Sequence, residues 1–143
     1  MIHVNRHRGF LLDDLGSSIP NEQSRMANSK QLAGLIGPTL VALGVTEAMN
    51  LSVFAGNPPG VVYLNGTILF VAGLAVVRAH NRWAFDWTLL VTLTGWAALL
   101  VGLYRMIAPQ APQVQPGIAS TTIFALIVVI GAFLTYRAFA PDA

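Results

Sequence analysis

The chain contains no cysteine among its 143 residues, and charged residues make up only 10% of it. The absence of cysteine excludes disulfide bonds, zinc–thiolate sites, iron–sulfur clusters and thiol catalysis. Soluble domains typically carry about 25% charged residues, so this composition is far more apolar than theirs. Hydrophobic residues make up 55% of the sequence, and the mean hydropathy is +0.62. Both values are typical of a membrane protein.

The chain has only three histidines and a small net charge, which argue against a metal site and a nucleic-acid-binding surface respectively. His3 and His7 have helical spacing but lie in a polar segment, and His80 stands alone, so we expect no metal site. A net charge of +2 is too small for a nucleic-acid-binding surface. The sequence carries no recognisable catalytic or cofactor-binding motif. We therefore expect a non-enzymatic protein without a cofactor.

Four apolar segments are long enough to cross a bilayer, which takes about 20 helical residues. The segments between them are short and rich in Pro, Gly, Asn and Gln, as is typical of turns between antiparallel helices. The sequence therefore predicts an all-α integral membrane protein, a four-helix bundle of antiparallel up-and-down hairpins. The predicted spans are residues 31–54, 59–77, 87–107 and 117–139.

Residues 1–30 form a polar segment of mixed charge in front of the first span. Its Ser, Pro and Asn residues interrupt any amphipathic pattern, so we interpret it as a disordered tail. The four-span bundle then occupies residues 31–143. Met26 opens a second plausible start, directly before the apolar run. Translation from Met1 and translation from Met26 both remain open.

Basic residues are distributed unevenly between the two sides of the predicted bundle. Lys and Arg are enriched in the cytoplasmic segments of membrane proteins. This bias predicts that both termini and the turn 78–86 lie in the cytoplasm, as in a bacterial-type inner membrane protein. Seven basic residues (Arg6, Arg8, Arg25, Lys30, Arg78, Arg82 and Arg137) fall on one side and Arg105 on the other.

Glycines recur in three pairs seven residues apart, which is two helical turns in a left-handed crossing, and Gly44, Gly73, Gly102 and Gly131 also recur at intervals of 29. Such a pair leaves a strip without side chains on one face of a helix. Helices in lipid have no hydrophobic drive to associate, so close approach at small residues is their main means of packing. We predict that these glycines lie at helix–helix contacts: Gly37, Gly44, Gly66, Gly73, Gly95, Gly102 and Gly131.

Glu47 lies inside the first apolar span, where a charge costs roughly 2.5–3.5 kcal/mol at the helix centre. Counting 1.5 Å per residue from the span ends places polar residues of all four spans in one outer-leaflet layer. In one interpretation Glu47 forms an ion pair with Arg105, and Asn50, Asn65 and Thr121 complete its hydrogen bonds. In the other, Arg105 extends to the headgroups and Glu47 is protonated or bonded to neighbouring Thr and Asn. The candidate layer is Glu47, Asn50, Asn65, Tyr104, Arg105 and Thr121.

A second polar cluster lies in the predicted turn between the second and third spans. Its basic and aromatic side chains suit contact with an anionic lipid or a partner, and its histidine is a candidate pH-sensitive group. The alternative is an ordinary basic turn with aromatic anchors. The candidate residues are Arg78, His80, Arg82 and Trp83.

The predicted function is that of an accessory, assembly or stability component of a membrane system. The alternative is a small channel or transporter that uses the layer around Glu47 and Arg105. The inner half of the bundle offers few polar groups beyond Thr92 and Thr94, which disfavours a water-filled path. The expected partners are the lipid bilayer and either a second copy or another membrane protein, with no nucleic acid.

Overall fold

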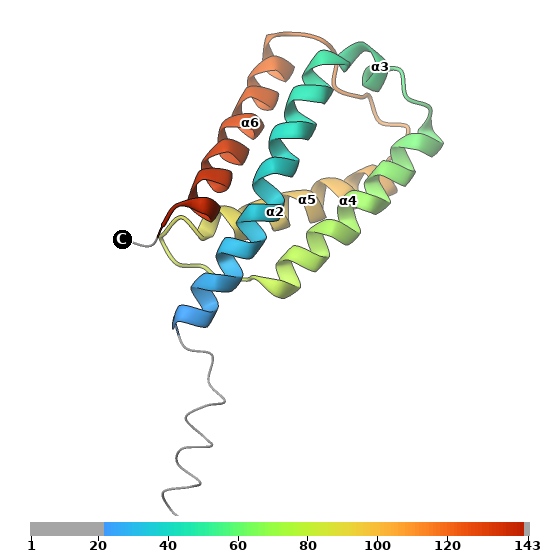
Figure 1. Ribbon diagram of the computed structural model, residues 1–143. Coiled ribbons are helices and arrows are strands. Elements are labelled where there is room, and N and C mark those ends of the chain that lie inside the picture. Colours follow the sequence, from blue (N-terminus) through green and yellow to red (C-terminus); the bar gives the residue numbers. More distant parts are fainter. Residues whose placement is uncertain (1–21, 142–143) are drawn as a thin grey trace, which may run out of the picture.

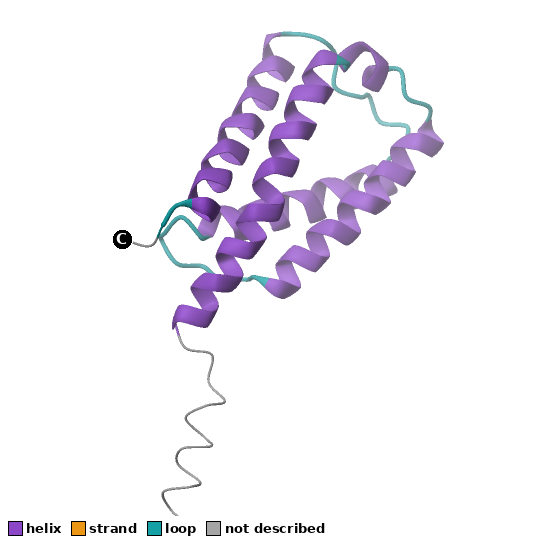
Figure 2. Ribbon diagram, in the orientation of Figure 1, coloured by secondary structure: helices purple, strands orange, loops and turns teal. Residues whose placement is uncertain are grey.

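A computed structural model of the protein describes the structure of residues 22–141. These residues form five helices and no strand: α2 (Glu22–Met49), α3 (Leu51–Ala55), α4 (Pro59–Ala79), α5 (Leu89–Ile107) and α6 (Ile118–Phe139) (Figures 1 and 2). By length and composition, α2, α4, α5 and α6 are each apolar enough to cross a membrane. The predicted all-α fold with four spanning helices is confirmed, and the chain is a multi-pass membrane protein.

Three of the four spanning helices begin and end close to the predicted boundaries, and proline or glycine marks the start of two of them. Pro59 occupies the first position of α4, where a missing backbone N–H leaves no hydrogen bond unmade. The backbone N–H of Gly117, just before α6, donates to Ser120 Oγ at 3.0 Å. Such local bonds satisfy groups at a helix start that have no partner within the helix.

The first helix differs from the prediction at both ends. Residues 22–30 are helical and continuous with the span, whereas we expected them to belong to a disordered tail. They are mostly good helix formers, and Asn28 Nδ2 fixes them by donating to the Ala79 carbonyl at 3.2 Å. At the other end, the Asn50 side chain donates to the Thr46 carbonyl at 2.8 Å, and the helix breaks there before α3. The rest of the predicted tail, residues 1–21, lies outside the described residues.

The bundle consists of two closely packed helix pairs, α2 with α6 and α4 with α5. Glycines of the two members face each other: a Cβ added to Gly102, Gly73 or Gly131 would lie 2.8 Å from the carbonyl oxygen of the glycine opposite. The opposing residues are Gly66, Gly95 and Gly37 respectively. All seven glycines singled out in the sequence are buried at contacts between two helices, and Gly44 is the one that faces larger side chains: Gly37, Gly44, Gly66, Gly73, Gly95, Gly102 and Gly131.

The two pairs meet at one end of the bundle and diverge toward the other (Figure 1). We call the first the terminal end, because both ends of the described chain lie there with residues 80–88. The opposite, distal end carries α3 and residues 108–117. Three contributions close the terminal end: a buried apolar cluster, a hydrogen bond from Lys30 Nζ to the Ala140 carbonyl, and Arg137 lying over the Trp87 ring. The cluster is Ala33, Ile36, Val91 and Leu134.

Candidate functional site

A cleft with a volume of about 340 Å³ lies where the two helix pairs diverge. This volume falls within the roughly 300–1,000 Å³ that is typical of small-molecule sites. All four spanning helices contribute to its walls, which are mainly apolar. Its polar lining groups are Thr94, Glu47, Asn65 and Arg105. The apolar lining residues are Leu40, Leu43, Leu69, Ala97, Ala98, Val101, Phe124, Ile127 and Ile130, with Gly44 between them.

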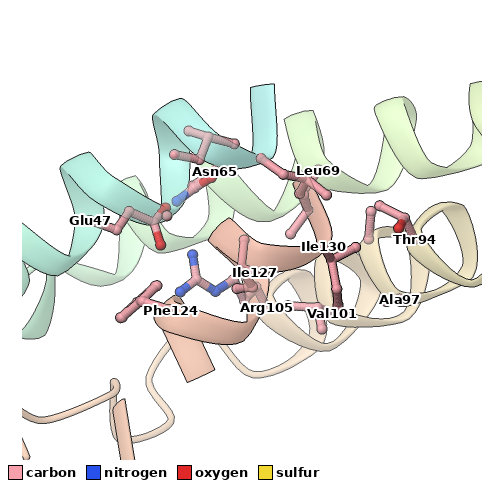
Figure 3. A pocket seen from close by; sticks show the side chains of 14 residues that line it. Glu47, Asn65, Leu69, Thr94, Ala97, Val101, Arg105, Phe124, Ile127 and Ile130 are labelled. Atoms are coloured by element: carbon pink, nitrogen blue, oxygen red, sulfur yellow. The ribbon is translucent and has the colours of Figure 1, made fainter. Parts of the chain in front are cut away.

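Glu47, Asn65 and Arg105 stand together toward the distal end of the cleft and point toward one another (Figure 3). Glu47 lies two residues before the end of α2, and Arg105 lies two residues before the end of α5. All three residues are half-buried. The guanidinium of Arg105 is close enough to act electrostatically on the Glu47 carboxylate, but within the described residues no direct ion pair joins the two. The site therefore presents a guanidinium and a carboxyl group that face each other across a gap.

The glycine contacts also determine where these charged side chains point. A Cβ on Gly66 would lie 2.8 Å from the Cβ of Arg105, so this glycine makes room for the arginine stem against α4. Gly44 packs against Val128 of α6. Residues three apart share a helix face, so Glu47 is held beside that contact. Each helix pair therefore contributes one side chain to the cleft next to a glycine contact: Glu47 from the α2–α6 pair and Arg105 from the α4–α5 pair.

A smaller cavity of about 30 Å³ adjoins the charged end of the cleft. A cavity needs roughly 10–15 Å³ to hold a water molecule, so this one is large enough to be hydrated. Glu47 and Arg105 line both cavities and thus connect the apolar cleft with the polar segments of the distal end. The other lining residues are Leu51, Phe54, Asn57, Gln113, Val114 and Phe124.

The other three members of the expected polar layer do not line the cleft. Asn50 is exposed and bonded to its own helix, and Thr121 Oγ1 donates to the Gly117 carbonyl at 3.0 Å. Tyr104 is 59% exposed on the outer face of α5. Asn50 and Thr121 therefore do not bond to Glu47 or Arg105, because their side chains turn back onto their own helices.

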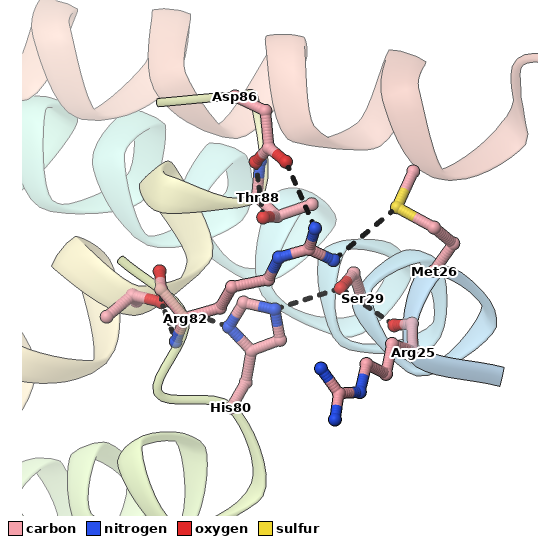
Figure 4. A network of polar contacts seen from close by, with 8 residues as sticks. Arg25, Met26, Ser29, His80, Arg82, Asp86 and Thr88 are labelled. Atoms are coloured by element: carbon pink, nitrogen blue, oxygen red, sulfur yellow. Dashed lines mark hydrogen bonds and ion pairs between the residues drawn. The ribbon is translucent and has the colours of Figure 1, made fainter. Parts of the chain in front are cut away.

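His80 is placed inside the protein, which corrects its expected contact with lipid or a partner. The residue is only 6% exposed. Its Nδ1 lies 3.0 Å from Thr92 Oγ1 and its Nε2 lies 2.9 Å from Ser29 Oγ (Figure 4). One imidazole thus joins α2 to α5 at the terminal end. Ser29 and Thr92 were not recognised as its partners from the sequence, since nothing in the pattern brings the start of α2 to this turn.

The hydrogen bonds of Thr92 determine which nitrogen of His80 carries the proton. Thr92 Oγ1 donates its one proton to the Arg82 carbonyl at 3.0 Å and accepts from the Arg82 backbone N–H at 3.1 Å. Its oxygen must therefore also accept from His80 Nδ1–H. The Ser29 hydroxyl can then donate to Nε2, or instead to the Arg25 carbonyl at 3.0 Å. A neutral imidazole with its proton on Nδ1 makes both of its hydrogen bonds when the Ser29 hydroxyl donates to Nε2.

Burial lowers the pKa of His80 below its ordinary value, and the nearby positive charge of Arg82 lowers it further. Asp86 acts in the opposite direction and is the weaker influence. Asp86 accepts hydrogen bonds from the backbone and hydroxyl of Thr88, and these bonds hold its own pKa low against the opposing effect of burial. The neutral form of His80 is therefore the one that the fold favours.

We expect the protein to become less stable as the pH falls below about 6.5, the ordinary pKa of histidine. The unfolded chain takes up a proton near that pH, whereas folded His80 resists it, so its contribution is complete above 6.5 and is lost as the pH falls through the lower folded pKa. Thermal unfolding in detergent across this range measures the effect. A His80→Gln variant should lack this part of the pH dependence, and an identical profile in both proteins would contradict it.

Replacing Thr92 with valine is expected to lower the free energy of unfolding by about 1–3 kcal/mol, because it leaves buried partners without a hydrogen bond. The matched control is Thr94→Val in the same helix, where the hydroxyl donates only to the Leu90 carbonyl one turn earlier. That change should be close to neutral. Denaturant titration of both variants in detergent tests the difference, and equal losses would show that the His80 network is not a stabilising contact.

The remaining members of the basic turn differ in how far their side chains are exposed for contact with a lipid or a partner. Arg82 is half-buried and contacts Asp86 at 3.8 Å and Met26 Sδ at 3.9 Å. Arg78 is exposed, and Trp83 is 62% exposed. These two side chains keep the exposure that a lipid or partner contact requires, and that contact stays a prediction.

Comparison with known proteins finds no matching family model, no matching curated protein and no matching solved structure. A functional proposal for this chain therefore depends on the geometry and chemistry of its own residues.

Proposed function

We propose that the chain is a non-enzymatic inner-membrane protein that serves as an accessory, assembly or stability component of a membrane system. The observation that supports this is the cleft between the two glycine-packed helix pairs, which has apolar walls and carries Glu47 and Arg105 facing each other at its distal end. Space at this depth must be filled, because an empty void forfeits the packing contacts of its lining. The lining offers groups that bind another membrane component by contact and hydrogen bonds. In this proposal, the protein acts by binding such a component in the cleft.

The orientation is part of the same proposal. Arg25, Lys30, Arg78, Arg82 and Arg137 all belong to the terminal end of the described chain, whereas Arg105 belongs to the distal end. The positive-inside rule then supports a terminal end in the cytoplasm and a cleft that opens in the outer leaflet.

Single cysteines, introduced into a chain that has none, are expected to report this topology. A cysteine at Asn57 or Gln113 should react with a membrane-impermeant reagent added outside cells, and one at Asn81 should react only after the membrane is opened. Labelling of position 81 from the outside would reverse the assignment.

The accessory role is tested by purification in a mild detergent, with mass determination and identification of what remains bound. Ala98 lines the cleft, so Ala98→Phe should fill it and release the bound component. Ala72→Phe is the matched control, because Ala72 is exposed on α4 and does not line the cleft. The mass distinguishes a second copy from another protein or a lipid. Identical material bound to all three proteins would exclude the cleft as the place of binding.

A small transporter is the second candidate, and the arrangement of the pairs favours it. The two pairs contact each other mainly at the terminal end, so a movement that opened this contact and closed the distal end would turn Glu47 and Arg105 from the distal side to the terminal side. The apolar cluster and the His80 bonds close any path through the terminal end in this structure. A correctly folded Glu47→Gln protein that lost ion or solute flux in liposomes would favour transport over the accessory role.

A further inference from the structure

We propose that the cleft binds one phospholipid whose headgroup carries both a phosphate and a primary ammonium group, with an acyl chain along the apolar walls. This inference rests on the proposed function, because it names the membrane component that the cleft holds. It follows from the charges that face each other without direct contact, from the acceptors beside them, and from the shape of the cleft.

Arg105 is suited to the phosphate. Its guanidinium presents several N–H donors in one plane, which match two oxygens of a phosphate at once. It lies two residues from the end of α5, or about 3 Å along the helix axis. A helix of 19 residues, such as α5, is about 28 Å long and nearly matches the roughly 30 Å hydrocarbon core of a bilayer. Arg105 therefore stands a few ångström inside the edge of the hydrocarbon core, where its long side chain can extend to a lipid phosphate.

Glu47 and Asn65 are suited to the ammonium group. The carboxylate of Glu47 and the amide oxygen of Asn65 both accept hydrogen bonds, and a primary ammonium donates three. A quaternary choline group has no N–H to donate and is typically held by several aromatic faces. Phe124 is the one aromatic residue among those that line the cleft. The lining thus favours an ethanolamine-type headgroup over a choline-type one.

The charge balance of the site discriminates further among lipids. A zwitterionic headgroup places its negative end at Arg105 and its positive end at Glu47, so both protein charges gain a partner. An anionic headgroup without an amine would satisfy Arg105 but leave Glu47 unpaired beside a negative charge, which costs free energy in a site of low dielectric. The adjoining cavity of about 30 Å³ gives the headgroup contact with water from the distal end.

The apolar part of the cleft accommodates a chain. Leu40, Leu69, Val101 and Ile130 come from the four spanning helices and line the walls between the charged end and the buried cluster at the terminal end. A cleft of about 340 Å³ is small for a whole phospholipid, so one acyl chain lies within it and the other stays in the surrounding bilayer. The two tightly packed pairs form preorganised walls, which reduces the ordering cost of binding.

The full-length protein, stripped of lipid in detergent, tests this by native mass spectrometry after addition of phosphatidylethanolamine, phosphatidylcholine or phosphatidylglycerol. The wild type should bind phosphatidylethanolamine at least about tenfold more tightly than the other two. Glu47→Gln should reduce the preference over phosphatidylcholine to near unity, and Asn65→Leu should weaken it. Arg105→Gln should weaken binding of all three lipids. Tyr104→Phe, at an exposed neighbouring position, should leave every affinity unchanged.

The outcomes separate this inference from the proposed function. Equal binding of the three lipids to the wild type, or an unchanged preference in both Glu47→Gln and Asn65→Leu, would overturn the assignment of the ligand. If Ala98→Phe still released the natively bound component in that case, the cleft would remain the place of action. If Ala98→Phe released nothing, the proposed function would fail as well. Circular dichroism and size-exclusion profiles matching the wild type establish that each variant compared is folded.

Discussion

Replacing Gly102 with alanine is expected to lower the free energy of unfolding by about 1–3 kcal/mol or more. The added Cβ would overlap the backbone nitrogen of Phe70 and lie 2.8 Å from the Gly66 carbonyl oxygen. These are backbone atoms, so α4 and α5 must move apart to admit the methyl group. Lipid provides no hydrophobic drive to restore the contact. The change gains up to about 1 kcal/mol of helix propensity, and the expected loss is what remains after that gain.

The control for this change is Gly60→Ala in α4, because a Cβ at Gly60 meets no atom within 4 Å. It should be neutral or slightly stabilising. Gly73→Ala should behave like Gly102→Ala, since its Cβ would lie 2.8 Å from the Gly95 carbonyl. Reversible unfolding in mixed micelles, followed by circular dichroism, measures all three. If Gly60 and Gly102 tolerated alanine equally well, close backbone approach would not be what holds the α4–α5 pair together.

These glycines show how far the sequence predicts the fold. A seven-residue interval reveals that a helix has a face without side chains, and a segment of about 20 apolar residues reveals that it spans the bilayer. Both properties are local to one helix. The identity of the helix that packs on a given face depends on the whole fold. Gly37 lies opposite Gly131, so the first spanning helix packs against the last one and not against the next one along the chain. Loop length alone does not predict that choice.

For the candidate site, the sequence predicts how far along each helix a polar residue lies, but it does not predict toward which neighbour the side chain points. Counting residues from the span ends predicts Glu47, Asn65 and Arg105 at one level, because the rise of a helix is constant, and in the structure all three line one cleft. Whether a side chain faces the cleft depends on the rotation of its helix, which packing determines. Asn50 and Tyr104 have the right depth and point elsewhere.

His80 illustrates a second limit of prediction from sequence. A histidine between two arginines resembles a surface residue in any local pattern, and its burial depends on the helix that continues back to Glu22. Because residues 22–30 are polar, the sequence pattern assigns them to the tail and not to the first helix. The bonds of Ser29 and Asn28 to the second turn are contacts between segments far apart in sequence.

Removing either charge at the distal end of the cleft is expected to destabilise the protein in detergent that contains no phospholipid. Glu47→Gln leaves Arg105 without a nearby negative charge, and Arg105→Gln leaves Glu47 without a positive one. Breaking a fully buried, bonded ion pair costs about 3–5 kcal/mol. Here both residues are half-buried, do not form a direct ion pair, and line a cavity large enough for water. We therefore expect each single variant to lose a smaller amount, about 1–3 kcal/mol of unfolding free energy.

The double variant Glu47→Gln/Arg105→Gln should recover part of these losses, because it removes the uncompensated charge that each single variant leaves behind. The coupling energy from the four proteins should then be at least about 0.5 kcal/mol, the lower limit for residues that interact. Tyr104→Phe combined with Glu47→Gln is the control cycle, and its losses should add. If the losses at Glu47 and Arg105 also added, the two side chains would not interact energetically. They would then be two independent groups in one cleft, and the assignment of both to a single zwitterionic headgroup would lose its support.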